Sequence, residues 1–404
     1  MLALRYRQFL PVLLATGLAL NTFLAWRDRD LVRKGYQDFT AYYAAGKIVR
    51  TGMAPSLYDQ GLQFRVQREF APDVIIRHGP LPYIHPPFEA LLFVPLTFLP
   101  YFTAYLVWDA LSAAMLVVML VLLLPHIPLL RKSFAICTVA VFVYFPAFVC
   151  LLQGQDMIIV LLLLALVYSS IEKGRYAQAG LWLGAGVFRP HLVLPIVLIL
   201  LFDRRFRSVL GFACSALAAS LISIATVGWR GFLEYPNYVW QLEQHLGRGA
   251  ILPTAMPNLR GFVAIFTRDG YPLSLVLTFA SSLFLLILAI RLFRRAEHPE
   301  RLDLAFSVAV LVSVLVSYHA FMYDLSLLLL PVLFLVNLAV SKNGDMHWSS
   351  ALPIGLLFFT PLLMLLALGL GRLNFLVPVL LLWLFGIRRE IVRIHVDHRL
   401  AQSA

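Results

Sequence analysis

The run 103–125, TAYLVWDALSAAMLVVMLVLLLP, contains a single charged side chain, that of Asp109. An α-helix rises 1.5 Å per residue, so about 20 apolar residues cross the roughly 30 Å hydrocarbon core of a bilayer. The run therefore predicts a transmembrane helix, and similar apolar runs lie on both sides of it.

The composition of the whole chain agrees with this prediction. Of the 404 residues, 61% are hydrophobic and 13% are charged, and the mean hydropathy is +0.83. Soluble domains have about 45–50% apolar and about 25% charged residues. The remaining polar residues are too few to cover a soluble surface, so soluble enzymes, disordered proteins and nucleic-acid binders are excluded.

Working outward from 103–125, the apolar runs predict an all-α integral membrane protein with about twelve spans, drawn as one polytopic domain over 1–404. The predicted spans are 9–26, 103–125, 134–151, 155–171, 176–188, 191–202, 207–227, 272–293, 303–318, 320–340, 350–369 and 373–388. The segment 88–100 is too short to span and ends at a proline, which indicates a half-inserted segment. The two short spans at 176–188 and 191–202 are expected to break around Arg189-Pro190, because proline cannot continue the helical hydrogen bonds.

The basic residues predict the orientation. With both termini in the cytoplasm, 18 of the 33 Lys and Arg residues lie on the cytoplasmic side, and most others fall in two long loops, 27–87 and 228–271. Long loops obey the positive-inside rule weakly. Both long loops are then extracytoplasmic, and 389–404 is a cytoplasmic tail. The formal net charge of +12 reflects this topology and does not indicate a nucleic-acid partner.

In this topology the unusual polar residues gather at the outer side of the membrane. Ionisable groups at membrane depth are costly and are candidate functional residues, so their convergence predicts a cavity that opens away from the cytoplasm. The residues concerned are Asp38, His85, Gln153, Gln155, Asp156, Arg189, His191, Asn258, Arg260, Tyr318, His319, Tyr323 and Asp324.

Four of these residues also fit simple structural roles. Asp38 and Asp156 each precede an expected helix and can be N-caps. Arg189 follows an apolar run and can extend its charge to the membrane interface. His319 can be a satisfied polar residue at a helix end. The sequence leaves these alternatives open beside the functional ones.

Five blocks of sequence, taken in order, resemble glycosyltransferase family 87, whose members are membrane enzymes of the GT-C superfamily that use polyprenyl-phosphate sugars. The blocks are Asp38-Phe39-x-x-Tyr42-Tyr43-Ala44-Ala45, Tyr83-Ile84-His85-Pro86-Pro87-Phe88, Gly154-Gln155, Arg189-Pro190 with the later Asp203-Arg204-Arg205-Phe206-Arg207, and Asn258-Leu259-Arg260-Gly261. The resemblance runs from about residue 36 to 335. The chain departs from the family pattern at His85, where an aromatic residue is frequent, and at Arg189, where lysine is frequent.

The resemblance implies a site with three parts. Asp38 matches the acidic residue of the first outer loop and is the expected general base for the acceptor hydroxyl. The donor phosphate is expected to meet Arg189 and His319, with Arg260, His85 and His191 as further candidates. The sugar or acceptor is expected to contact Tyr42, Tyr43, Tyr83, Gln155, Asp156 and Asn258.

The resemblance also implies the partners and the reaction. The donor is a polyprenyl-phosphate-linked sugar, mannose in the alpha-(1,2)-mannosyltransferases of the family, and the acceptor is a glycolipid or glycan. A single displacement inverts the anomeric configuration. Neither a metal nor another cofactor is expected. The expected location is the plasma (inner) membrane, with the active site extracytoplasmic.

Two other classes of protein compete with this reading. A lipid or glycan transporter uses a similar polar cavity, but transporters often show repeated halves, and this sequence shows no internal repeat. A non-catalytic assembly subunit has no need for converging polar groups. The discriminating observation is whether Asp38, Arg189 and His319 reach one cavity.

Overall fold

The computed structural model describes residues 2–74, 79–244, 253–267, 271–294, 299–341, 346–358, 360 and 376–403. Every regular element in these ranges is a helix, which confirms the predicted all-α class. The first helix, α1 (Leu2–Lys34), contains the predicted span 9–26 and continues past it.

Four helical segments of the described chain are long and apolar enough to cross a membrane. They are α5 (Tyr101–Leu123), most of α11 (Phe206–Gln244), most of α13 (Tyr271–Phe293), and the continuous pair η4 (Met322–Leu328) and α15 (Leu329–Ser341). A fifth is added if α6 (Pro128–Val143) and α7 (Phe145–Gln153), which are bent by 61°, count as one span. The chain is thus a multi-pass membrane protein, with four or five such spans in its described part where the sequence predicts about twelve.

The other predicted spans coincide mostly with helices that are not among these four or five segments. These helices are α8 (Met157–Glu172), α9 (Tyr176–Ala185), α10 (Pro190–Phe202), α14 (Pro299–Val316), α16 (Trp348–Phe358) and α18 (Leu376–Ser403). The predicted break at Arg189-Pro190 is present, since α9 ends before it and α10 begins at Pro190. Much of the predicted span 350–369 and the start of 373–388 lie outside the described residues.

Three segments differ from the sequence expectation. The predicted span 134–151 is interrupted at Tyr144, where the backbone is extended just before the Phe145-Pro146 start of α7. The outer loop predicted over 228–271 begins as a helix, because α11 only kinks at Gly228, with a φ of 76°, and then continues to Gln244. The segment 389–404, predicted as a cytoplasmic tail, continues α18 as a helix to Ser403, and its cytoplasmic location stays a prediction.

The first predicted outer loop, 27–87, is also largely helical. It contains the end of α1, then α2 (Phe39–Arg50), η1 (Ala54–Ser56) and α3 (Gln60–Phe70). The segment predicted as half-inserted, 88–100, forms α4 (Pro87–Phe93) and η2 (Val94–Phe98). These elements stack on aromatic side chains, including a parallel contact between Tyr42 and Phe93 with ring centroids 4.7 Å apart.

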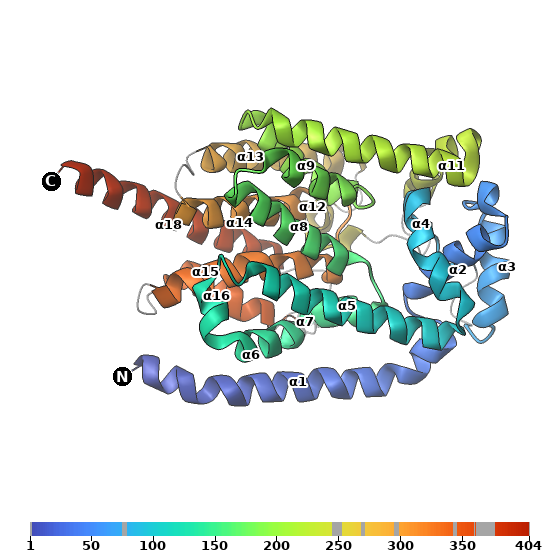
Figure 1. Cartoon of the computed structure of the whole chain (residues 1–404), viewed down its shortest axis with the longest axis horizontal. Helices are drawn as coiled ribbons and strands as arrows, with labels where there is room; N and C mark the ends of the chain where they lie inside the picture. The colour runs from blue at the N-terminus through green and yellow to red at the C-terminus, as the bar shows by residue number, and fades with distance from the viewer. Residues whose placement is uncertain are drawn as a thin grey trace.

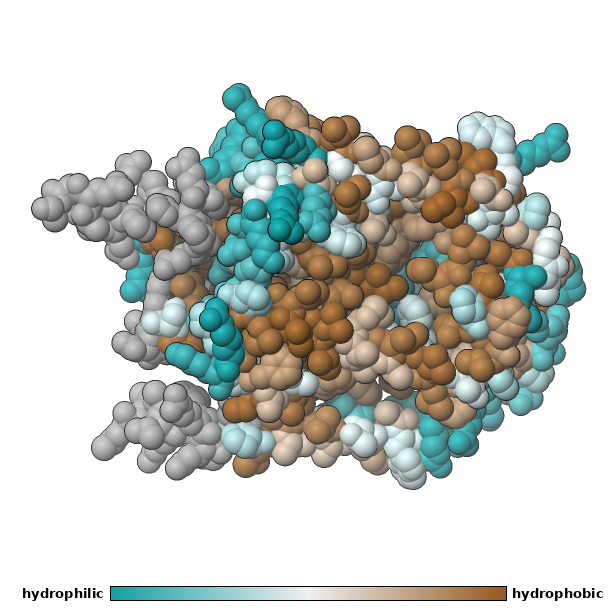
Figure 2. All heavy atoms as spheres, viewed as in Figure 1, coloured by the Kyte–Doolittle hydropathy of each residue, from teal (hydrophilic) through white to brown (hydrophobic). Residues whose placement is uncertain are grey.

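The helices form an elongated bundle. In Figure 1 the start of α1 and the end of α18 lie at the same end of the molecule, and α2, α3 and α4 lie at the opposite end. Figure 2 shows hydrophobic residues across the middle of the visible face, with hydrophilic residues toward both ends. Large apolar side chains on several helices are exposed, such as Leu111, Leu210 and Phe279, as expected for a surface that faces lipid.

Glycines allow two of these helices to approach closely. A Cβ atom at Gly180 of α9 would lie 1.9 Å from the Ser208 carbonyl oxygen, and one at Gly211 of α11 would lie 2.2 Å from the Ala177 carbonyl oxygen. Small residues at such positions let helix backbones pack in a membrane, where lipid gives no hydrophobic drive for association. The short helix α9 is therefore held along α11 by backbone contact.

Candidate active site

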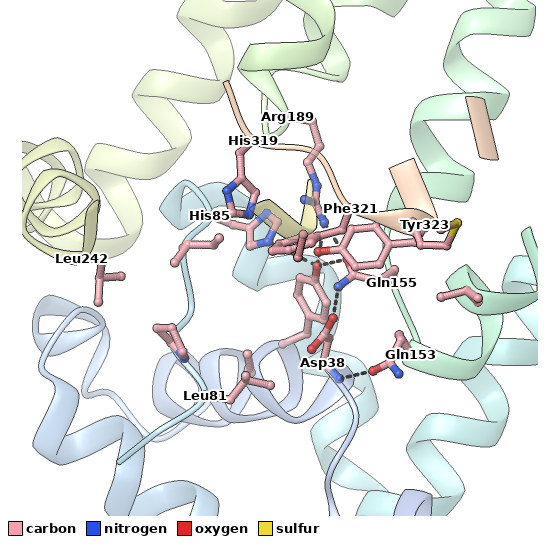
Figure 3. A pocket seen from close by; sticks show the side chains of 17 residues that line it. Asp38, Leu81, His85, Gln153, Gln155, Arg189, Leu242, His319, Phe321 and Tyr323 are labelled. Atoms are coloured by element: carbon pink, nitrogen blue, oxygen red, sulfur yellow. Dashed lines mark hydrogen bonds between the residues drawn. The ribbon is translucent and has the colours of Figure 1, made fainter. Parts of the chain in front are cut away.

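A cavity of about 470 Å³ opens where the irregular helix ends meet. The polar side chains of its wall come from five places in the chain. They are Asp38 and Tyr42 just before and in the first turn of α2, His85 before α4, Gln153 and Gln155 at and after the end of α7, Arg189 before α10, and His319 and Tyr323 between α14 and α15. Apolar side chains complete it: Ala41, Leu81, Pro82, Ile84, Val149, Leu242, Ala255, Phe321 and Met322. The cavity thus brings together segments that are distant in the sequence (Figure 3).

The positions of three residues test whether they form one functional site or have only the structural roles that the sequence left open. Asp38, Arg189 and His319 all line this one cavity. Asp38 occupies the N-cap position of α2, yet its side chain makes no capping hydrogen bond. Arg189 is 2% exposed and is engaged by side chains within the protein, so it does not extend to the membrane interface.

Two glutamines hold Asp38 from the same helix end. Gln155 donates a hydrogen bond of 2.6 Å from Nε2 to Asp38 Oδ2. Gln153 accepts a bond of 3.3 Å at Oε1 from the Asp38 backbone N–H, and Figure 3 shows both contacts. Gly154 separates the two glutamines, and its φ of 62° ends α7 in a left-handed turn that glycine adopts without strain. This turn places both amide side chains beside Asp38.

A buried cluster of polar side chains forms part of the cavity wall and extends behind it to Asp156. The Arg189 guanidinium forms an ion pair with Asp156, which is 0% exposed. Its Nη2 also donates to the Tyr42 hydroxyl at 2.9 Å and to Gln155 Oε1 at 2.6 Å. Burial raises the pKa of Tyr42 well above its ordinary value of 10.0, so the hydroxyl stays protonated. It donates a hydrogen bond of 2.7 Å to Gln155 Oε1.

His85 and Glu89 extend this buried polar cluster. His85 Nε2 lies 3.2 Å from the Tyr42 hydroxyl, and its Nδ1 lies 2.9 Å from Oε2 of the fully buried Glu89. Burial, followed by the nearby Arg189 charge, lowers the pKa of His85 from 6.5 to about 3. His85 is therefore neutral at physiological pH.

The same region contains one three-residue group with the donor types and spacing of a metal site. In the described part of the chain, ligand atoms of His85, Glu89 and Asp156 lie within 4.8 Å of one another. Nitrogen and carboxylate ligands suit several divalent ions. However, both carboxylate oxygens of Asp156 accept hydrogen bonds from Arg189 Nε, at 3.1 and 3.2 Å. A cation already neutralises this carboxylate, which makes the group a poor match for a second one.

His319 forms the opposite side of the cavity from Asp38 (Figure 3). Burial and the charges of Arg189 and Arg260 lower its pKa from 6.5 to about 3. Its Nε2 has no hydrogen-bond partner among the described residues, which leaves this nitrogen for a ligand. His191 does not line the cavity, but its ring centroid is 6.3 Å from that of His319.

Four predicted sugar or phosphate contacts have protein partners away from the cavity. The hydroxyl of Tyr43 donates to the Leu99 carbonyl, and that of Tyr83 donates to the Pro86 carbonyl. Asn258 accepts from the Gly261 amide at the start of α12 (Leu259–Thr267), and Arg260 pairs with Glu243. With Asp156 and His191, these are the predicted residues that do not line the cavity; Asp38, Tyr42, His85, Gln155, Arg189 and His319 do.

The sequence did not point to Glu89, and it placed Gln153 among the converging polar residues without indicating a role for it in the site. Glu89 is an isolated carboxylate in an apolar run, four residues after His85, and that spacing on a helix is a signal for a contact. The Gln-Gly-Gln pattern at 153–155 was a second signal, because a glycine turn between two amides directs both to one side.

The fold and the cavity define an all-helical, multi-pass membrane protein with one carboxylate, one guanidinium and two neutral imidazoles around a single cavity. The sequence profile of glycosyltransferase family 87 matches residues 83–317, more than half of the chain, and the chain belongs to this family. The match confirms the resemblance found in the sequence and supports glycosyltransferase activity with a sugar donor and an acceptor. Comparison with curated proteins and with solved structures finds no significant match.

Proposed function

We propose that the protein transfers a sugar from a polyprenyl-phosphate donor to a hydroxyl of a lipid or glycan acceptor, with inversion and with Asp38 as the general base. The acceptor oxygen attacks the anomeric carbon while its proton passes to Asp38. The bond from that carbon to the phosphate oxygen breaks, and the electron pair leaves with the phosphate. Mannose is the first sugar to test, because of the family resemblance.

The observation that carries this proposal is the distribution of charge around one cavity. Asp38, Arg189 and His319 all line this cavity of about 470 Å³, and Figure 3 shows Asp38 on the side opposite Arg189 and His319. A general base and a phosphate-stabilising group must face opposite ends of the bond that is exchanged. The apolar residues Leu242, Phe321 and Met322 in the same wall suit the neck of a polyprenyl chain.

The two candidates for the donor phosphate, neutral His319 and cationic Arg189, have different roles in the proposal. His319 offers an unpartnered ring nitrogen to the phosphate. Arg189 also lines the cavity, but it uses Nε and Nη2 for Asp156, Tyr42 and Gln155, so it contributes positive potential from within the wall. Fixed charges of this kind stabilise a developing anion without rearranging during the reaction.

The proposed topology has about twelve passes, both termini in the cytoplasm and the cavity on the extracytoplasmic side of the plasma membrane. It is supported by the arrangement in Figure 1, where α2 to α4 lie at the end of the bundle opposite both chain ends. The basic clusters between the predicted spans favour the same orientation.

The test is transfer by the purified protein from a panel of polyprenyl-phosphate sugars to extracted lipids, with new glycolipids detected by mass spectrometry. We expect Asp38→Asn to lower turnover by about 10²–10⁴-fold. Asp59→Asn is the matched control, because Asp59 caps α3 through the Leu62 amide and lies outside the cavity, and asparagine caps helices equally well. Near-normal turnover of Asp38→Asn, or no transfer from any donor by folded wild-type protein, contradicts the proposal.

A further inference from the structure

Gln155 has its polar atoms directed at protein groups, although the sequence suggested that it binds sugar. Its Oε1 accepts from Arg189 Nη2 at 2.6 Å and from the Tyr42 hydroxyl at 2.7 Å. Its Nε2 donates to Asp38 Oδ2 at 2.6 Å. Gln155 is 3% exposed, and its amide links Arg189 to the Asp38 carboxylate.

We propose that Gln155 is a positioning residue that orients the Asp38 carboxylate and favours its ionised form, with Arg189 and Tyr42 fixing the orientation of the amide. This inference rests on the proposed function, in which Asp38 must be deprotonated to act. It replaces the sugar-binding role expected for Gln155 from the sequence.

The orientation of the amide follows from the chemistry of its neighbours. Arg189 has donors and no acceptor, and it faces one end of the Gln155 amide at 2.6 Å. That end must be the carbonyl oxygen, because an NH₂ group there would place donor against donor. The NH₂ end is then directed at Asp38, and an N–H can only donate. Protonation of Asp38 Oδ2 disrupts this bond, so the contact favours the ionised carboxylate.

Other charged and titratable groups also face Asp38, and they act in opposite directions. Tyr323 and Asp324 of η4 interact electrostatically with Asp38, and a negative charge on either opposes ionisation of its carboxylate. Arg189 and His319 line the same cavity, and a positive charge on either favours ionisation. Tyr42, on the helix that Asp38 precedes, stays protonated because of its burial. The Gln155 hydrogen bond acts at shorter range than these charges, directly on Oδ2.

The experiment compares wild type with Gln155→Leu and with Gln153→Leu as the matched variant. Gln153 contacts the Asp38 backbone and not its carboxylate. We expect Gln155→Leu to move the acid limb of the kcat/KM profile upward by about one pH unit. Gln153→Leu is expected to leave that limb at its wild-type pH. Tyr42→Phe, which removes one donor from the Gln155 carbonyl, is expected to shift the limb in the same direction by less.

An infrared titration gives the same answer without turnover. The carbonyl band of protonated Asp38, identified by its loss in Asp38→Asn, is followed as the pH falls. In Gln155→Leu it is expected to appear about one pH unit above its wild-type midpoint. An unchanged midpoint overturns the positioning role. A raised donor KM with an unmoved acid limb also overturns it, and indicates that Gln155 binds the sugar. In that case an inactive Asp38→Asn variant still supports the proposed function.

Discussion

Replacing Arg189 by methionine tests the buried polar cluster that Arg189 forms with Asp156, Tyr42 and Gln155. Methionine keeps an unbranched chain of similar shape but removes the guanidinium. The side chains of Arg189 and Asp156 are 3% and 0% exposed. The substitution therefore leaves the Asp156 carboxylate without its cation in a site with almost no access to water, and it removes a donor from both Tyr42 and Gln155.

The expected loss of stability is large. Removing one partner of a buried ion pair costs about 3–5 kcal/mol, because the remaining charge stays buried and uncompensated. The double variant Arg189→Met/Asp156→Leu removes both charges, so it is expected to recover much of this loss. The coupling energy between the two sites is then at least about 2 kcal/mol, within the range measured for residues in contact.

The assay is equilibrium unfolding of the detergent-solubilised variants, measured as the free energy of unfolding. Arg27→Met is the control for the same substitution in an exposed pair, since Arg27 and Asp28 are 59% and 20% exposed. Exposed pairs contribute about 0–1 kcal/mol. If Arg189→Met loses no more stability than Arg27→Met, or if the two single losses simply add in the double variant, the electrostatic reasoning is refuted.

Three other outcomes are expected. Gly180→Ala forces a Cβ against the Ser208 carbonyl oxygen, 1.9 Å away before relaxation. The free energy of unfolding should therefore fall by about 1–3 kcal/mol. Unchanged stability would mean that α9 and α11 are not in backbone contact. Because the pKa of His85 is lowered from 6.5 to about 3, the unfolded chain binds more protons between these values, and stability should fall as the pH falls from about 6.5 toward 3. His85→Gln should make that fall shallower, and an equally steep fall contradicts the burial argument. Chelation with EDTA should leave transfer unchanged, because a guanidinium already neutralises Asp156; loss of transfer that Mn²⁺ restores would instead assign His85, Glu89 and Asp156 to a metal.

The sequence predicted the all-helical membrane class and the break at Arg189-Pro190 because both depend on local properties. Apolar length determines whether a helix can cross a bilayer, and a proline ends a helix without help from tertiary contacts. The continuation of α11 past Gly228 was missed for the opposite reason. Glycine and the polar residues after it suggest a loop, yet Tyr238, packed at 5.2 Å against Tyr58, belongs to a helix that is stabilised by tertiary contacts.

The sequence predicted part of the candidate site, because six of the residues that it singled out for the site line the cavity. Asp38, Arg189 and His319 lie at helix ends, and the positive-inside pattern predicts that those ends share one side of the membrane. Their partners were not predictable, because the bond from Gln155 to Asp38 joins residues 117 positions apart. Tyr43 and Tyr83 illustrate the limit: their residue type suits a sugar ring, but their hydroxyls are used by nearby carbonyls.

The buried pair of Arg189 and Asp156 has a physical reason within a transferase site. A lone arginine at this depth costs too much unless it is paired, whereas a lone carboxylate would repel the donor phosphate. The pair is formally neutral, but Arg189 lines the cavity and Asp156 lies behind it. The cavity therefore experiences the positive end of a fixed dipole, and the same guanidinium orients Gln155 toward Asp38. In the proposed reaction, this one ion pair thus links the stabilisation of the leaving phosphate to the positioning of the base.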